Sequence, residues 1–434
     1  MSSELVKPRP GEARGISAMA QKLIANEILK IAAEIRALVR GGAQILNLTI
    51  GDFKSDQFPI PELLKEGTKR ALDQGHSNYP PANGVLEARE AVRELFLDRF
   101  GLDYPVEGVL LGGGARPMIA ASYMCLVSPG ERVVYSLPSW NNNHYSTIVG
   151  ANQVELPTTE ATGFFPRVED IEPHLEGARL ICLNTPQNPT GTVMKPAELE
   201  RLCREIVREN ERRLSKGKPV CYLLFDQVYW MLTFGDARHA TPVNLVPEMA
   251  RYTIFVDAIS KSFAATGLRV GWGVGPSDVI ERMAALLTHL GAWAPHPEQV
   301  ATAALLRDKP ALDAYHHHMS KGVLARLEAL ARGARHLAAE GLPVDSIDPE
   351  GAIYLSLRLA ILGKRAPGGE IIASDEAIRG FLLREAGVAL VPFQAFGVKE
   401  ETGWFRASVG AVSVEDCERA MARIGDALRR LEPG

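Results

Sequence analysis

Cysteine is scarce in this chain, because its 434 residues include five cysteines and no two of them form a CxxC pair. An odd number of scattered cysteines argues against a disulfide framework and indicates reduced thiols in a cytosolic protein. The sequence also lacks an apolar run of transmembrane length, and its N-terminus lacks the apolar stretch of a signal peptide. We therefore expect a cytoplasmic protein that does not enter a membrane.

A large excess of charge is also missing, since the net charge is only -4. Without a basic field there is nothing to attract nucleic acid or an anionic membrane, so we expect a small-molecule partner. Three consecutive histidines at 316–318 do not indicate a metal site, because neighbouring helical positions point in different directions, and we expect a solvated helix surface there. The composition, 46% hydrophobic and 23% charged, is that of a globular protein.

The N-terminal region is expected to contain an arm, a helix and a strand. Residues 1–15 are polar and include two prolines, which predicts a mobile arm. Residues 18–39 carry apolar side chains at helical spacing, which predicts one amphipathic helix that ends at Gly41 and Gly42. A short strand is expected at 44–50.

Helices then alternate with short apolar strands from about residue 55 to 275. Helices are expected at 61–74, 86–99, 115–127 and 196–215, and strands at 108–111, 132–136, 153–156, 179–183, 220–225 and 252–256. This alternation predicts a mostly parallel sheet covered by helices, which is an α/β domain. A long helix from about 310 to 340, followed by shorter strands and helices, predicts a second, smaller α+β domain.

Polar or glycine-rich residues follow five of the expected strands. They are 112–116, 138–140, 184–191, Asp226 with Tyr229, and 260–262 with Arg269. Ligands in open α/β sheets bind beyond the carboxyl ends of the strands, so we expect these residues to converge on one edge of the sheet. The glycine-rich stretch 271–275 looks like a dinucleotide loop but lacks the strand–turn–helix context of one.

These residue types meet the chemical needs of a pyridoxal phosphate site. Glycines before a helix allow backbone N–H groups to bind a phosphate, and an arginine adds a charge clamp. A carboxylate keeps the pyridine nitrogen protonated, so that the ring acts as an electron sink. An aromatic side chain stacks on the ring, and a lysine forms the imine and moves the substrate's α-proton.

From about residue 46 to 423 the sequence resembles the class I/II aminotransferases of fold type I, the aspartate aminotransferase superfamily. The most specific motifs are 260–271 and 184–191, together with Asp226-x-x-Tyr229 in the same order. The resemblance implies a large domain with a mostly parallel seven-stranded sheet and a smaller α+β domain built from both termini. The expected segments are 1–55 (arm and part of the small domain), 56–310 (large domain) and 311–434 (small domain).

The resemblance also implies a role for each site residue. Lys261 would form the Schiff base with pyridoxal phosphate and move the proton, and Asp226 would pair with the pyridine nitrogen. The other implied cofactor contacts are Gly114, Ala115, Arg116, Ser260 and Arg269 around the phosphate, Asn188 and Tyr229 at the phenolic oxygen, and Trp140 on the ring.

Substrate and partner contacts follow from the same resemblance. Arg406 would bind the substrate α-carboxylate, with Gly51 and Asn188 beside it. Tyr79 would reach the phosphate of a partner subunit, which implies a homodimer.

Two positions depart from the family pattern. Ala258 stands where the family has a phosphate-binding serine, so Ser260 would fill that role alone. His144 follows the stacking aromatic with an extra residue between, which weakens its assignment as the residue that orients Asp226.

The expected function is a ping-pong transfer of an amino group between an L-amino acid and a 2-oxo acid. A pyridoxal phosphate-dependent lyase, such as a C–S lyase or an aminocyclopropane-carboxylate synthase, is the alternative with the same motifs. A non-catalytic cofactor-binding regulator is a third possibility. The substrate side chain is not identified, although Ile50, Trp230 and the loop 291–295 are candidates for an apolar pocket.

Overall fold

The computed structural model describes residues 15–23 and 27–433, so nearly all of the predicted N-terminal arm lies outside the described residues. The single helix predicted at 18–39 is wrong, because the segment forms α1 (Ala18–Lys22) and α2 (Glu27–Arg40). Leu23 is extended and ends α1. The physical reason is that tertiary packing supports only the second piece: Ile31 and Ile35 of α2 are buried against the C-terminal part of the chain, whereas no residue of α1 is buried.

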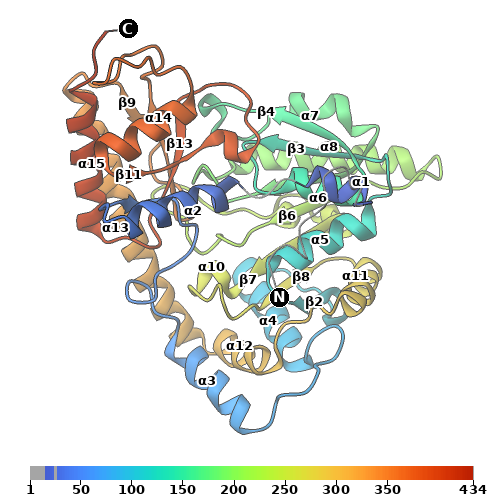
Figure 1. Ribbon diagram of the computed structural model, residues 1–434. Coiled ribbons are helices and arrows are strands. Elements are labelled where there is room, and N and C mark those ends of the chain that lie inside the picture. The colour runs from blue at the N-terminus through green and yellow to red at the C-terminus, as the bar shows by residue number, and fades with distance from the viewer. Residues whose placement is uncertain (1–14, 24–26, 434) are drawn as a thin grey trace.

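A seven-stranded sheet forms the centre of the molecule (Figure 1). Its strands are β2 (Val109–Gly112), β3 (Arg132–Leu137), β4 (Asn152–Pro157), β5 (Ala178–Asn184), β6 (Tyr222–Asp226), β7 (Thr253–Ala258) and β8 (Gly271–Val274). The order is β2-β8-β7-β6-β5-β3-β4, and only β8 runs antiparallel to its neighbours. The predicted mostly parallel α/β sheet is confirmed.

Strand β8 was not predicted, because its glycines disfavour a strand when the sequence is considered alone. In the structure the strand is completed by its neighbours β2 and β7. A Cβ atom on Gly271 would lie only 2.4 Å from the carbonyl carbon of Gly114. Glycine is therefore needed here so that β8 can pass close to the start of helix α5.

Helices cover both faces of this sheet. One face carries α3 (Glu62–Asp73), α4 (Leu86–Phe100), α7 (Val168–Leu175), α8 (Pro196–Leu214), α9 (Pro242–Leu245) and α12 (His296–Arg307). The other carries α5 (Ala115–Leu126), α6 (Asn142–Val149) and α11 (Ser277–Leu290). The helices α6, α7, α9, α11 and α12 were not predicted from the sequence.

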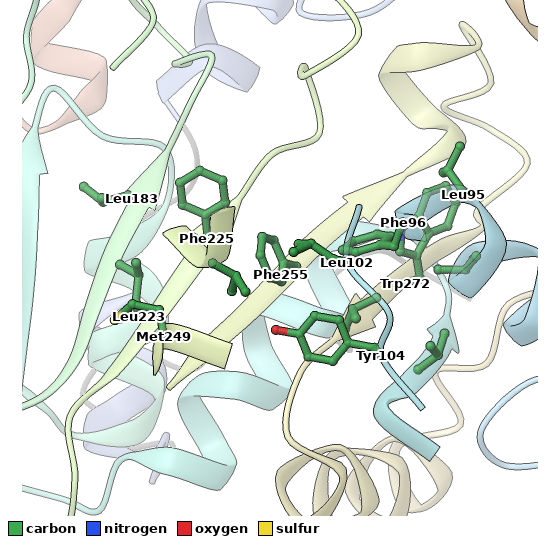
Figure 2. Close-up of a cluster of buried hydrophobic side chains, with 14 of the residues drawn as sticks. Leu95, Phe96, Leu102, Tyr104, Leu183, Leu223, Phe225, Met249, Phe255 and Trp272 are labelled. Carbon is green, nitrogen blue, oxygen red and sulfur yellow. The ribbon is translucent and has the colours of Figure 1, made fainter. Parts of the chain in front are cut away.

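The core on the first face combines aliphatic and aromatic side chains (Figure 2). Phe255 of β7 contacts Phe96 of α4 and Phe225 of β6 edge-to-face, with ring centroids 5.5 and 5.8 Å away. Leu224, between Leu223 and Phe225 in β6, points to the opposite face. Both faces of the strand are thus apolar, and each fully buried side chain contributes about 1.5–3 kcal/mol to folding. This packing holds the carboxyl ends of the strands in fixed positions.

The C-terminal part of the chain is built on a separate four-stranded antiparallel sheet, with the order β12-β13-β10-β9. Its strands are β9 (Val344–Ser346), β10 (Tyr354–Leu359), β12 (Val391–Pro392) and β13 (Trp404–Ser408), and its helices are α13 (Lys309–Ala339), α14 (Asp375–Phe381) and α15 (Val414–Leu428). The N-terminal strand β1 (Leu46–Asn47) pairs with β11 (Val388–Ala389). Both ends of the chain therefore contribute to this part, whereas the exact boundaries at 55 and 310 stay a prediction.

The three consecutive histidines at 316–318 differ in their surroundings. His316 lies on α13, where its ring hydrogen-bonds the carbonyl oxygen of Met231. The expectation of a solvated surface is thus wrong for His316, while His317 and His318 are exposed. Among residues 15–23 and 27–433, no helix has the length and apolar character needed to cross a bilayer.

Candidate active site

A cavity of about 840 Å³ lies where the carboxyl ends of the parallel strands meet α5, α2 and β13. Strand ends and helix starts from distant parts of the sequence form its wall, as expected for an open α/β sheet. Of the residues predicted for the site, eleven line the cavity: Gly51, Ala115, Arg116, Trp140, Asn188, Asp226, Tyr229, Ser260, Lys261, Arg269 and Arg406. Gly114 and Tyr79 do not line it, and Tyr79 is exposed.

Lys261 lies in the short helix α10 (Ile259–Ser262), directly after β7. Its Nζ atom donates a hydrogen bond to the carbonyl oxygen of Gly51 at 2.6 Å and lies 6.0 Å from the ring centre of Tyr229. Burial lowers the pKa of the Lys261 amine to about 8; Asp52 opposes this shift, and nearby arginines, with Arg406 the largest contributor, add to it. A larger fraction of this amine is therefore neutral near pH 7 than for an exposed lysine.

Asp226 ends strand β6, and its Oδ1 atom accepts a hydrogen bond from the N–H group of Val228 at 3.2 Å. Burial raises the pKa of its carboxyl group to about 7. In the described part of the chain, no cationic side chain pairs with this carboxylate. A buried carboxylate without a partner is complementary to a positive group on a ligand.

Arg406 of β13 is almost entirely buried, with 1% of its surface exposed. Its guanidinium donates to Oδ1 of Asn188 at 3.0 Å and to the carbonyl oxygen of Thr49 at 2.8 Å. Its central carbon lies 4.6 Å from the ring centre of Tyr354 and 5.0 Å from that of Phe396. Within the described residues it has no carboxylate partner, so this fixed cation is suited to bind an anionic ligand.

The hydroxyl of Tyr229 lies 2.7 Å from the hydroxyl of Tyr354, which was not predicted as a site residue. Tyr354 lies in β10 and also packs its ring against Arg406. Sequence offered no signal for it, because tyrosine is an ordinary residue in a strand.

An anion-binding cradle lies at the start of α5. Gly114 precedes the helix with a φ of 96°, and a Cβ there would lie 2.3 Å from Nη2 of Arg269. That guanidinium donates to the carbonyl oxygens of Gly113 and Thr266, each at 2.8 Å. Burial lowers the pKa of Arg269, and the like charge of Arg116 lowers it further. Two arginines beside a helix N-terminus form a site for a phosphate group.

The remaining residues discussed from the sequence lie in different positions relative to the cavity. Trp140 lines the cavity, with its ring centre 5.3 Å from the guanidinium carbon of Arg116. Ser260 lines it too, while Ala258 is a fully buried residue without a hydroxyl. In the part of the chain that the structure describes, no hydrogen bond joins His144 to Asp226.

The expected apolar pocket is largely not formed in this chain. Ile50 lines the cavity, but Trp230 does not: it packs against the core of the first sheet face, and its indole donates to Asp257 at 2.7 Å. Trp293 packs against Tyr79, with ring centres 5.0 Å apart. The structure instead adds polar residues that sequence reasoning missed, notably Arg36, Asp52 and Thr266. They lie on a helix and two loops whose local patterns do not indicate a site.

Comparison with known proteins gives a consistent result. Residues 43–424 match the family model for aminotransferase class I and II. The aspartate aminotransferase of Rhizobium meliloti (strain 1021) is 30% identical over 94% of this chain and 94% of its own length. The aspartate/prephenate aminotransferase of Thermus thermophilus is 30% identical over 96% of this chain and 100% of its own length. The crystal structure of the Rhizobium meliloti aspartate aminotransferase has a TM-score of 0.87 at 27% identity, covering 97% of this chain and 100% of that one.

The fold and the cavity thus define a fold type I enzyme with a site that fits pyridoxal phosphate. A buried carboxylate with a raised pKa, a lysine with a lowered pKa and a two-arginine cradle lie around one cavity. The chain belongs to the class I and II aminotransferase family and is a pyridoxal phosphate-dependent aminotransferase. These relatives favour amino-group transfer over the lyase alternative.

Proposed function

We propose that Lys261 is the residue that carries pyridoxal phosphate and moves the substrate's α-proton. The observation that carries this proposal is the position of its amine in the cavity, at 2.6 Å from the Gly51 carbonyl and with its pKa lowered to about 8. A lysine of this kind is both a better nucleophile and a better general base near neutral pH than an exposed one.

Bound pyridoxal phosphate supplies an electron sink for the carbanion that forms when the α-proton leaves. Asp226 keeps the pyridine nitrogen protonated, because a cation restores the partner that its buried carboxylate lacks. The other proposed cofactor contacts are Gly114, Ala115, Arg116, Ser260 and Arg269 for the phosphate, Asn188 and Tyr229 for the phenolic oxygen, and Trp140 for the ring.

Arg406 and Gly51 are proposed to position the substrate. The Arg406 guanidinium is fixed by Asn188 and by the Thr49 carbonyl, so an α-carboxylate meets donors that are already oriented. A Cβ on Gly51 would lie 3.0 Å from the Tyr354 hydroxyl and 3.6 Å from Nη1 of Arg406, so glycine keeps a side chain out of this part of the cavity. Fixing the carboxylate directs the Cα–H bond toward Lys261, which is catalysis by positioning.

The pKa of Lys261 leads to a prediction for cofactor capture. Only the neutral amine attacks an aldehyde, so the rate at which the apoenzyme captures pyridoxal phosphate is expected to rise with pH and to level off above about pH 8. An amine with the ordinary lysine pKa of about 10.4 would continue to gain rate up to that pH. The measurement is stopped-flow absorbance of cofactor capture from pH 6 to 10.5.

The same series with Nα-acetyl-lysine in free solution serves as the control. Dividing the two rates removes the titration of the aldehyde and its phosphate, so that the ratio compares the enzyme amine with an ordinary lysine amine and should fall above about pH 8. A ratio that stays constant across the pH range would show that the protein does not lower the pKa of Lys261.

For the substrate, we propose an amino acid with a second carboxylate. The relatives are named for aspartate and for prephenate, and both compounds carry a second carboxylate. Two arginines line the cavity in addition to Arg406 and Arg269, namely Arg116 and the exposed Arg36 of α2. A substrate side chain with negative charge is attracted by them.

Helix α2 is anchored so that Arg36 stays at the cavity. Ile31 and Ile35 are buried in the cluster that contains Phe396. Glu34 forms an ion pair with Arg379 of α14 at 2.9 Å. These contacts on two sides of the helix leave Arg36 facing the cavity.

Arg36→Gln is expected to lower kcat/KM for aspartate by about two- to fivefold, the size of an exposed ion pair. For alanine kcat/KM should stay the same, and the effect on aspartate should shrink in high salt because the charge is screened. Arg40→Gln, on the same helix but outside the cavity wall, is the matched control. Equal losses for aspartate and alanine would contradict the assignment of Arg36.

We also propose a homodimer in which Tyr79 reaches the partner's phosphate. In the single chain the Tyr79 side chain is 83% exposed, although it is large and aromatic, and its ring centre lies 5.0 Å from that of Trp293. Such exposure favours a residue that contacts another subunit.

A cytoplasmic location is proposed as well, supported by five cysteines that are all free thiols.

A further inference from the structure

The cavity contains one carboxylate that the roles above leave unassigned. Asp52 follows Gly51 in the chain and lines the same cavity as Lys261 and Arg406. The Gly51 carbonyl accepts the hydrogen bond from Lys261 at 2.6 Å, and a Cβ on Gly51 would lie 3.6 Å from Nη1 of Arg406. The backbone that leads into Asp52 therefore lies between the amine of Lys261 and the guanidinium of Arg406.

The Asp52 side chain is held in one position. Its Oδ1 atom accepts hydrogen bonds from Oγ1 of Thr266 at 2.6 Å and from the N–H group of Phe53 at 2.8 Å. The backbone is confined too, because a Cβ on Gly410 would lie 2.2 Å from the carbonyl oxygen of Asp52. A carboxylate fixed in this way is preorganised to bind a ligand.

One oxygen of Asp52 remains available. Across residues 15–23 and 27–433, Oδ2 of Asp52 accepts no hydrogen bond and no cationic side chain forms an ion pair with it. The arginines of the cavity are suited to anions: Arg269 and Arg116 to a phosphate, and Arg406 to a carboxylate. A positive group from the substrate would be the natural partner of Asp52, and every amino acid brings one as its α-ammonium.

We propose that Asp52 binds the α-ammonium of the incoming amino acid while Arg406 holds its α-carboxylate. This inference rests on the substrate and cofactor roles proposed above. An amino acid zwitterion meets a carboxylate and a guanidinium beside Lys261, so both of its charges are paired. A 2-oxo acid has no ammonium and experiences only repulsion from Asp52. Asp52 thus makes one site distinguish the amino donor from the oxo-acid acceptor.

The test uses Asp52→Asn, which removes the charge but keeps an oxygen that accepts from Thr266 and Phe53. Spectral half-reactions of the holoenzyme give the Kd of the donor on the pyridoxal phosphate form and the Kd of its 2-oxo acid on the pyridoxamine phosphate form. The donor is whichever of aspartate, alanine and phenylalanine reacts fastest with the wild type. We expect the donor Kd to rise about tenfold or more, as for loss of a charged hydrogen bond. The acceptor Kd should fall or stay the same.

Calorimetry with succinate, which has carboxylates but no ammonium, provides a second readout. In the Asp52→Asn holoenzyme succinate should bind as tightly as in the wild type or more tightly. Thr266→Val is the matched structural control, because it removes the hydroxyl donor and keeps the carboxylate charge. It should change the donor and acceptor Kd values together, by less than about threefold.

Several outcomes would contradict the proposed role of Asp52. Donor and acceptor Kd values that rise by the same factor in Asp52→Asn, or that do not change, overturn the role of Asp52. Weaker succinate binding in that variant overturns the role of Asp52 as well, because the loss of a repulsive charge cannot weaken the binding of a dianion. If no donor changes the cofactor spectrum of the wild-type holoenzyme, the proposed function itself fails, and this is seen before any variant is made.

Discussion

Lys261→Ala is expected to reduce the rate of transamination by about 10⁴-fold or more, at the upper end of what a positioned proton-transfer group contributes. The loss is this large because one side chain is proposed both to form the covalent link and to move the proton. Lys261 faces the cavity, so its truncation leaves the hydrophobic clusters intact. The protein should therefore fold and still bind pyridoxal phosphate without a covalent bond.

Borohydride reduction followed by peptide mass spectrometry tests the covalent link independently of activity. In the wild type the cofactor mass should appear on the peptide that contains Lys261, and in the variant on no peptide. Lys309→Ala is the control, because Lys309 is an exposed lysine that pairs with Asp98 on the surface. A variant that keeps more than about a tenth of the wild-type rate is incompatible with the general-base role of Lys261.

Asp226→Asn is expected to lower kcat by about two to four orders of magnitude. Breaking a buried charge pair costs about 3–5 kcal/mol, and each 1.36 kcal/mol corresponds to a factor of ten. Asparagine keeps an oxygen in place of Oδ1, which accepts from Val228, so the shape of the strand end is retained. What is lost is the negative charge that is proposed to hold the proton on the pyridine nitrogen. KM for the amino acid should change little, because the substrate carboxylate is proposed to bind at Arg406.

Asp257→Asn provides a closely matched comparison. Asp257 is a buried acid near the end of the neighbouring strand β7, but it accepts from Trp230 and does not line the cavity. Burial raises the pKa of its carboxyl group as well. Single-turnover rates should fall in Asp226→Asn and stay near the wild-type value in Asp257→Asn. Equal loss in the two variants would mean that buried acids support the fold here and that Asp226 has no separate chemical role.

Much of the cavity wall could be predicted from the sequence because it depends on local pattern. Short apolar runs predict strands, and polar residues that follow parallel strands meet at one edge of the sheet. Asp226, Asn188 and Lys261 each follow such a run, and all three line the cavity. Their spacing within family motifs was enough to predict the cofactor, and the comparisons with known proteins bear that prediction out.

Local pattern also explains the elements that were missed. The glycines of β8 disfavour a strand until β2 and β7 flank it. The apolar positions of the N-terminal segment have one helical period, but only Ile31 and Ile35 of α2 are buried, and α1, which buries no residue, ends after Lys22. In both places tertiary packing outweighed the local preference.

The sequence by itself determined the fold class, the cofactor and the lysine expected to carry it, because strand periodicity and short motifs are properties of neighbouring residues. Only the tertiary structure decided what surrounds that lysine. Lys261 and Gly51 are 210 positions apart in the chain, and Arg406 and Thr49 are 357 apart. Contacts over such separations depend on how whole layers pack, so Asp52, Arg36 and Tyr354 became visible as neighbours of the site only when the chain was folded.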